Sequence, residues 1–86
     1  MTNGRLDRYV LLEAIYDEVD GSTTGSVHYD NLSERTGAAL GEIIDRIADL
    51  GAEGLVEGVM STEGPVSISS DGVLWVEQKR GGVATS

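Results

Sequence analysis

Few residues of this chain have the types and spacing that chemistry requires. The only histidine, His28, lies beside a predicted strand and has no acid at metal-ligand spacing near it. The carboxylates are spread over predicted helix surfaces rather than paired around an apolar pocket, which is typical of solvated faces. The chain has no cysteine, so it has neither a thiolate metal site nor a disulfide. We therefore expect no catalytic residue, no metal, no cofactor and a non-enzymatic role.

The polar loop Asp20–Ser26 is the one stretch whose composition suggests a small-ligand site. It is rich in glycine but lacks the lysine of a phosphate-binding loop. Acids precede Gly21 as in a calcium loop, yet Val19 occupies a position that would need an oxygen ligand, and no glutamate follows at the required distance. The sequence therefore indicates a solvated helix end here.

Composition limits the possible partners. The chain has 86 residues, enough for one domain, with 15 Asp and Glu against 6 Lys and Arg and a net charge of −9. Such an excess of acid disfavours a polyanionic partner. A composition that is poor in lysine and free of cysteine and phenylalanine also indicates a cytosolic protein of an extreme halophile, where molar salt shortens the Debye length to about 3 Å and weakens this objection. The alternative is an ordinary acidic domain.

No apolar run approaches the roughly 20 residues that a membrane span needs. The N-terminal residues also lack the hydrophobic core of a signal peptide. We expect a soluble, cytoplasmic protein without a membrane partner.

The segment 32–58 is the one around which the chain is organised. Five apolar residues recur at helical spacing and form one stripe: Leu40, Ile43, Ile44, Ile47 and Leu50. Gly37 permits the positive φ that a corner between two helices needs. Gly51 and Gly54 end the second helix before a run of β-type residues. The pattern predicts a helix-turn-helix followed by a strand.

The N-terminal part of the chain predicts one amphipathic helix, from Arg5 to about Val19. Its apolar stripe consists of Leu6, Val10, Leu11, Ala14, Ile15 and Val19. Leu12 and Tyr16 lie on the flank of this stripe, where they face either the predicted wing or a second subunit. Further on, Val27–Tyr29 predicts a short strand, and Asp30 is the predicted N-cap of a brief helix over Asn31–Thr36.

The C-terminal part predicts two short strands and a last helix. The strands, 54–61 and 66–69, flank a Gly-Pro turn, and Ser69 or Ser70 caps the helix. Trp75 on that helix is either a core residue or an exposed anchor for a partner. We expect one domain over residues 5–80, with flexible termini at 1–4 and 81–86.

These elements resemble the winged helix-turn-helix family of small archaeal and bacterial transcription regulators. The matching positions are Leu32, Thr36, Gly37, Ile43, Ile47, Leu50, Gly54, Leu55 and Val56, together with the closing segment ISSDGVLWVEQ, Ile68–Gln78. The resemblance implies an α+β winged helix-turn-helix with a three-helix core, a small antiparallel wing sheet and a C-terminal helix. It also implies a DNA-binding transcription regulator whose helix 39–50 enters the major groove of double-stranded DNA.

The candidate DNA-binding residues are Arg35, Ala38, Ala39, Gly41, Glu42, Arg46, Ser61 and Thr62. Arg35 and Arg46 would contact phosphate or guanine, the small residues would allow close approach, and the turn at Ser61–Gly64 would be the wing contact. The alternative for the arginines is a surface ion pair, for example Glu42 with Arg46 at i,i+4.

A second function follows from the acids on the same helix. We expect its outward face to consist of Ala38, Gly41, Glu42, Asp45 and Asp49, and three acids on one face would repel phosphates. Ile44 is apolar where relatives usually carry a polar residue, so it can join Leu12, Tyr16 or Trp75 in a patch for a homodimer or another protein. The alternative is therefore a winged-helix protein-protein interaction module with an acidic helix face that does not bind DNA.

Overall fold

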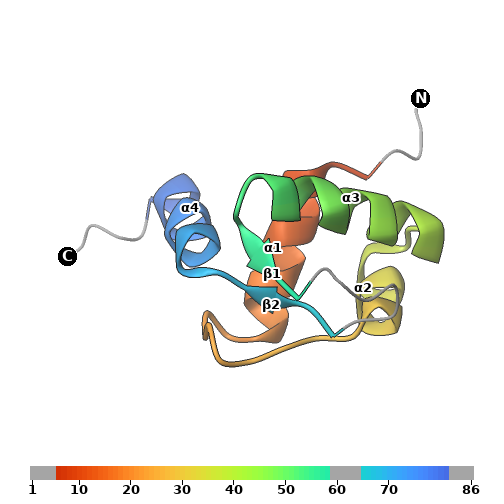
Figure 1. Cartoon of the computed structure of the whole chain (residues 1–86), viewed down its shortest axis with the longest axis horizontal. Helices are drawn as coiled ribbons and strands as arrows, with labels where there is room; N and C mark the ends of the chain where they lie inside the picture. The colour runs from red at the N-terminus through yellow and green to blue at the C-terminus, as the bar shows by residue number, and fades with distance from the viewer. Residues whose placement is uncertain (1–5, 59–64, 82–86) are drawn as a thin grey trace.

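A computed structural model describes residues 6–58 and 65–81 (Figure 1). In these residues the chain forms four helices and one two-stranded antiparallel sheet, which confirms the α+β class. The elements follow the order α1 (Arg8–Glu18), α2 (Tyr29–Thr36), α3 (Leu40–Ala52), β1 (Val56–Glu57), β2 (Ser67–Ile68) and α4 (Ser70–Arg80). Within the described residues no helix has the length and apolar character needed to cross a membrane.

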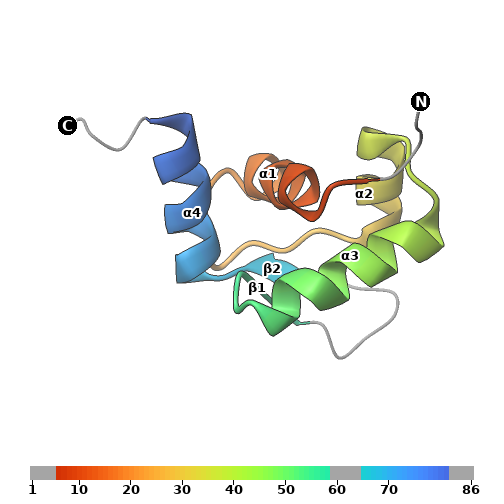
Figure 2. The same ribbon diagram turned by 90° about the horizontal axis from the view of Figure 1, so that it is seen from above.

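Helix α1 is the centre of the molecule. Figure 2 shows it between α2 and α4, with α3 passing below α1 and α2 and the sheet below α1. It contacts α2, α3, α4 and β2, and the core forms where these elements meet. Ile43, Ile47 and Leu50 on α3 are at most 1% exposed, which confirms the predicted burial of these three members of the stripe.

The sheet is small and has a fixed register. Val56 pairs with Ile68, and Glu57 pairs with Ser67. Val27 forms an isolated antiparallel bridge to Val66, with both backbone hydrogen bonds at 2.9 Å. The predicted strand over Val27–Tyr29 is thus reduced to one bridging residue. The part of the predicted strand 54–61 beyond Gly58 lies outside the described residues; within them that strand is limited to Val56–Glu57, and the predicted strand 66–69 is limited to Ser67–Ile68.

The predicted limits and inward face of α1 were partly wrong. The helix begins at Arg8 because the Asp7 side chain caps it, accepting a hydrogen bond from the Tyr9 N–H at 2.8 Å. Val10 is 54% exposed, although we placed it in the stripe, and Leu12 is fully buried, although we placed it on the flank. The reason is that α2, α3, α4 and β2 all pack on α1, so its buried side is turned toward Leu12 and away from Val10.

Helix α2 begins earlier than predicted. His28, not Asp30, is the N-cap residue, and no side chain caps the helix. Tyr29 is the first helical residue and is only 1% exposed, so burying its ring draws the helix start toward the core. The predicted corner is confirmed: Gly37 has φ of 77°, and its N–H donates to the Ser33 carbonyl at 2.9 Å.

Helix α3 begins at Leu40, after Ala39 as N-cap residue, and continues through Gly51 to Ala52. The prediction that Gly51 ends the helix was wrong, because the chain turns only at Gly54, where φ is 77°. Leu40, which we placed in the buried stripe, is 41% exposed because it lies at the first position of the helix.

The N-terminus of α4 is fastened to the corner between α3 and β1. The predicted cap is confirmed: the Ser69 Oγ accepts a hydrogen bond from the Gly72 N–H at 3.0 Å and donates one to the Gly54 carbonyl at 2.6 Å. Trp75 is half-buried and stacks on Tyr9 of α1, with 4.5 Å between ring centroids. It therefore joins two helices instead of filling the centre of the core.

Candidate binding surface

The outward side of α3 differs from the face that the sequence predicted. Leu40, Gly41, Asp45 and Ala48 are exposed, and Ile44 is half-buried. We call these five residues the α3 face. It carries one acid rather than three, no basic residue and no side-chain hydrogen-bond donor.

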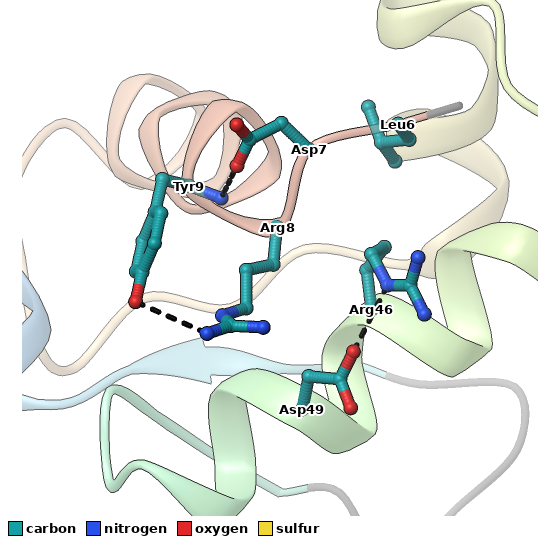
Figure 3. Close-up of a pocket in the computed structure, with 6 residues that line it drawn as sticks. All are labelled: Leu6, Asp7, Arg8, Tyr9, Arg46 and Asp49. Atoms are coloured by element: carbon teal, nitrogen blue, oxygen red, sulfur yellow. Dashed lines mark hydrogen bonds and ion pairs between the residues drawn. The ribbon is translucent and has the colours of Figure 1, made fainter. Parts of the chain in front are cut away.

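The two other acids of α3 lie on the flank toward the N-terminus of α1. Glu42 Oε2 accepts a hydrogen bond from the backbone N–H of Leu6. Asp49 Oδ2 accepts one from Arg46 Nε at 3.0 Å (Figure 3). The predicted Glu42–Arg46 pair is replaced by this i,i+3 pair, because Glu42 is already engaged by the N–H of Leu6, which lies just before α1.

Figure 3 shows the pocket at this flank, which has a volume of about 390 Å³ and is lined by Leu6, Asp7, Arg8, Tyr9, Arg46 and Asp49. Its two guanidinium groups and two carboxylates balance in charge. Arg8 Nε also lies 2.7 Å from Glu53 Oε2, and the Tyr9 hydroxyl donates to Glu53 Oε1 at 3.0 Å. Because these groups hold one another, the pocket fastens α1 to α3 rather than offering charge to a ligand.

Every lysine and arginine in the described residues has a carboxylate within 4 Å. Arg35 lies 2.8 Å from Glu18 and 3.5 Å from Asp17, at the end of α1. Arg80 reaches Asp17 at 3.2 Å, and Lys79 lies 3.7 Å from Glu13. Apart from Arg46, which pairs with Asp49 of its own helix, these basic residues link separate elements, and none of them extends from the α3 face.

A second pocket of about 400 Å³ lies where the N-terminal ends of α2 and α3 meet. It is lined by His28, Tyr29, Asp30 and Leu40. Tyr29 forms its buried wall, and burial raises the pKa of the Tyr29 phenol above its ordinary value. Asp30 is exposed, and within the described residues its carboxylate makes no ion pair or hydrogen bond. We call this hollow the α2–α3 pocket.

The structure brings together only some of the predicted site residues. Ala39 and Gly41 are exposed at the start of α3, whereas Ala38 is half-buried and its carbonyl accepts from Ser33 Oγ at 2.6 Å. Glu42 and Arg46 lie on the flank, and Arg35 lies beside the end of α1, away from the α3 face. Ser61 and Thr62 lie outside the described residues.

Two features of this surface escaped the sequence reasoning. The first is the exposure of Leu40. Its position shortly after the Gly37 turn, at the start of the helix, could have indicated this exposure. The second is the α2–α3 pocket, for which the sequence held no signal, because its walls come from two separate helix ends.

The predicted apolar patch around Ile44 does not form. Leu12 is fully buried, the Tyr16 hydroxyl donates to Glu77 Oε2 at 2.9 Å, and Trp75 stacks on Tyr9. These three residues lie in the core or at the contact of α1 with α4, whereas Ile44 lies on α3. An apolar patch around Ile44 would therefore consist of α3 residues alone.

The described residues hold no group of three or more His, Cys, Asp or Glu side chains placed to bind a metal ion. Comparison with protein-family models, with curated proteins and with solved structures found no match.

Proposed function

We propose that this chain is a winged helix-turn-helix domain that binds another protein through the α3 face. The observation that carries the proposal is the chemistry of that face: Leu40 and Ile44 supply apolar surface, Gly41 and Ala48 allow close approach, and Asp45 is its single charge. Interface centres are depleted in charged residues, and an exposed helix face without donors suits an apolar protein contact.

The winged-helix assignment is supported by the order and joining of the elements. Helices α2 and α3 meet at a left-handed Gly37, β1 and β2 pair antiparallel after α3, and the Val27–Val66 bridge adds a third extended segment to the sheet. Helix α4 follows directly, as the resemblance implies. Fold alone does not assign a function, so the choice depends on the surface.

Electrostatics disfavour a DNA-reading role for α3. If Arg35 and Arg46 both left their carboxylates for phosphates, two contacts would form, compared with about 6–10 in typical DNA-binding proteins. With a slope of about −0.9 per contact, two contacts make the affinity change only about tenfold between 50 and 200 mM salt. The net charge of −9 also repels DNA phosphates over distances shorter than the Debye length.

DNA binding by a transcription regulator is the second candidate, and one observation favours it. The structure leaves one acid on the α3 face, because Glu42 and Asp49 are held on the flank. The surface ion pair of Arg35 and the half-buried pair of Arg46 are worth only about 0.2–1 kcal/mol each, so either arginine can be redirected to a phosphate. Ile44 and Ala48 could then contact thymine methyl groups in the major groove.

A titration of the ¹⁵N-labelled chain with duplex DNA in molar KCl separates the two candidates. Protein docking predicts no saturable shift of the Gly41, Asp45 or Ala48 amides. Ala48→Arg adds a cation to the centre of the face, so it would strengthen DNA contact if DNA is the ligand. Saturable shifts of α3 amides, with a lower Kd for DNA in Ala48→Arg than in the parent chain, would establish the DNA function and refute docking.

We also propose a cytoplasmic location in a halophilic host. The acidic, cysteine-free composition supports both statements.

A further inference from the structure

The α2–α3 pocket is lined by one exposed apolar side chain, Leu40, by the polar side chains of His28 and Asp30, and by the buried Tyr29. Leu40 is 41% exposed and Tyr29 is almost fully buried, so part of the pocket wall is hydrocarbon. Asp30 lies on the first turn of α2, where it is exposed and within the described residues makes no ion pair. At about 400 Å³ the pocket can hold one long side chain, and it lies at the low end of the roughly 300–1,000 Å³ found for ligand sites.

The net charge at this pocket is negative. The N-terminus of α2 carries about half a positive charge, because no side chain caps its free N–H groups. The full negative charge of Asp30 exceeds it, which leaves an excess of about half a negative charge. Asp45 on the adjacent face adds a second carboxylate that makes no ion pair within the described residues.

We propose that the α2–α3 pocket takes an arginine or lysine side chain of the protein that docks on the α3 face. The methylene stem of such a side chain lies along Leu40, and its cationic end pairs with Asp30. The partner therefore presents an apolar surface to Ile44 and Ala48 with a basic residue beside it. This inference depends on the proposed docking function.

Charge complementarity selects this occupant over the others. A second copy of the chain would bring a further net charge of −9 against the same carboxylates. A nucleic acid would place phosphates beside Asp30 and Asp45. Within the described residues every lysine and arginine lies beside a carboxylate of its own chain, so a second copy would have to break such a pair to offer a cation.

Synthetic helical peptides with a Leu/Ala face test the proposal. Four peptides differ only in one anchor residue at the edge of that face, which is Arg, Lys, norleucine or Glu. Each is titrated into the ¹⁵N-labelled full chain at the lowest KCl concentration at which circular dichroism shows it folded. We expect the Arg and Lys peptides to shift the amides of Asp30, Leu40 and Ile44, and to bind about tenfold more tightly than the norleucine peptide.

Two charge-matched variants identify the carboxylate responsible. Asp30→Asn should remove the tenfold advantage of the Arg and Lys peptides and leave the norleucine peptide unchanged. Asp71→Asn is the control, because it removes one exposed acid from the first turn of α4 instead. Equal losses in both variants, or equal affinity of the Arg and norleucine peptides, would overturn the pocket assignment.

Failure of the docking function has a different signature. If the peptides shift α3 amides regardless of their anchor residue, docking stands and the pocket assignment is wrong. If none of the peptides shifts Gly41, Ile44 or Ala48, both proposals fail.

Discussion

The structure predicts that adding a single methyl group at Gly72 destabilises the fold strongly. Gly72 lies in the first turn of α4, and a Cβ added there would be 2.1 Å from the Leu55 carbonyl oxygen and 2.7 Å from Ile68 Cγ1. Ordinary contact begins at about 3.4 Å, so α4 would have to move outward by about 3.4 − 2.1 = 1.3 Å. A backbone carbonyl cannot rotate away as a side chain can.

That displacement disrupts the attachment of α4. The Ser69 N–H donates to the Leu55 carbonyl at 3.0 Å, and the Ser69 Oγ donates to the Gly54 carbonyl at 2.6 Å. Overpacking costs about 1–3 kcal/mol, and each weakened hydrogen bond adds about 0.5–1.5 kcal/mol. We therefore expect Gly72→Ala to lower the free energy of unfolding by about 2–6 kcal/mol, a large part of the roughly 5–15 kcal/mol of a typical domain.

Urea unfolding followed by circular dichroism, at one KCl concentration, measures this loss. Gly41→Ala is the matched control, since Gly41 is also helical and a Cβ there would meet nothing within 4 Å. It should gain about 0.5–1 kcal/mol from its better helix propensity. If Gly72→Ala were as stable as Gly41→Ala, the close contact of α4 with Leu55 would be refuted.

Three further predictions concern the core, the turn and pH. Leu12→Ala should lose about 2–5 kcal/mol in urea unfolding and Val10→Ala less than about 0.5 kcal/mol, and equal losses would contradict the burial of α1. Gly37→Ala should lose about 1–2 kcal/mol, because φ is 77° and open space surrounds the residue; an unchanged urea midpoint would refute the left-handed turn. The Tyr16 pKa is raised chiefly by its hydrogen bond to Glu77 and the Tyr29 pKa by burial, so both phenols stabilise the fold below pH 10.0 and lose that contribution as pH rises through their higher folded pKa values. Urea midpoints that stay constant well above that pH would contradict this.

The sequence was sufficient for features that depend on local chemistry. Ile43, Ile47 and Leu50 follow the helical period, and only one side of α3 is covered, so their burial could be predicted. The Gly37 corner and the Ser69 cap follow from the conformational and hydrogen-bonding preferences of those residue types.

Features set by distant residues could not be predicted in this way. The i,i+4 rule favoured a Glu42–Arg46 pair, but the Leu6 N–H, which is 36 residues away in sequence, engages Glu42. The direction of the buried side of α1, which decides between Val10 and Leu12, depends on where α2, α3 and α4 pack. The α3 face carries one acid rather than three because of these flanking contacts, which the sequence does not show.

Site-specific photo-crosslinking from the edge of the α3 face tests the central claim most directly. A benzophenone amino acid at Ala52, which is exposed on the same side of α3, is compared with one at Leu74, which is 49% exposed on α4. In the host cells we expect position 52 to form a discrete protein adduct that is lost in Ile44→Asp, and position 74 not to form it. Adducts with DNA from position 52, or a protein adduct that persists in Ile44→Asp, would contradict docking through this face.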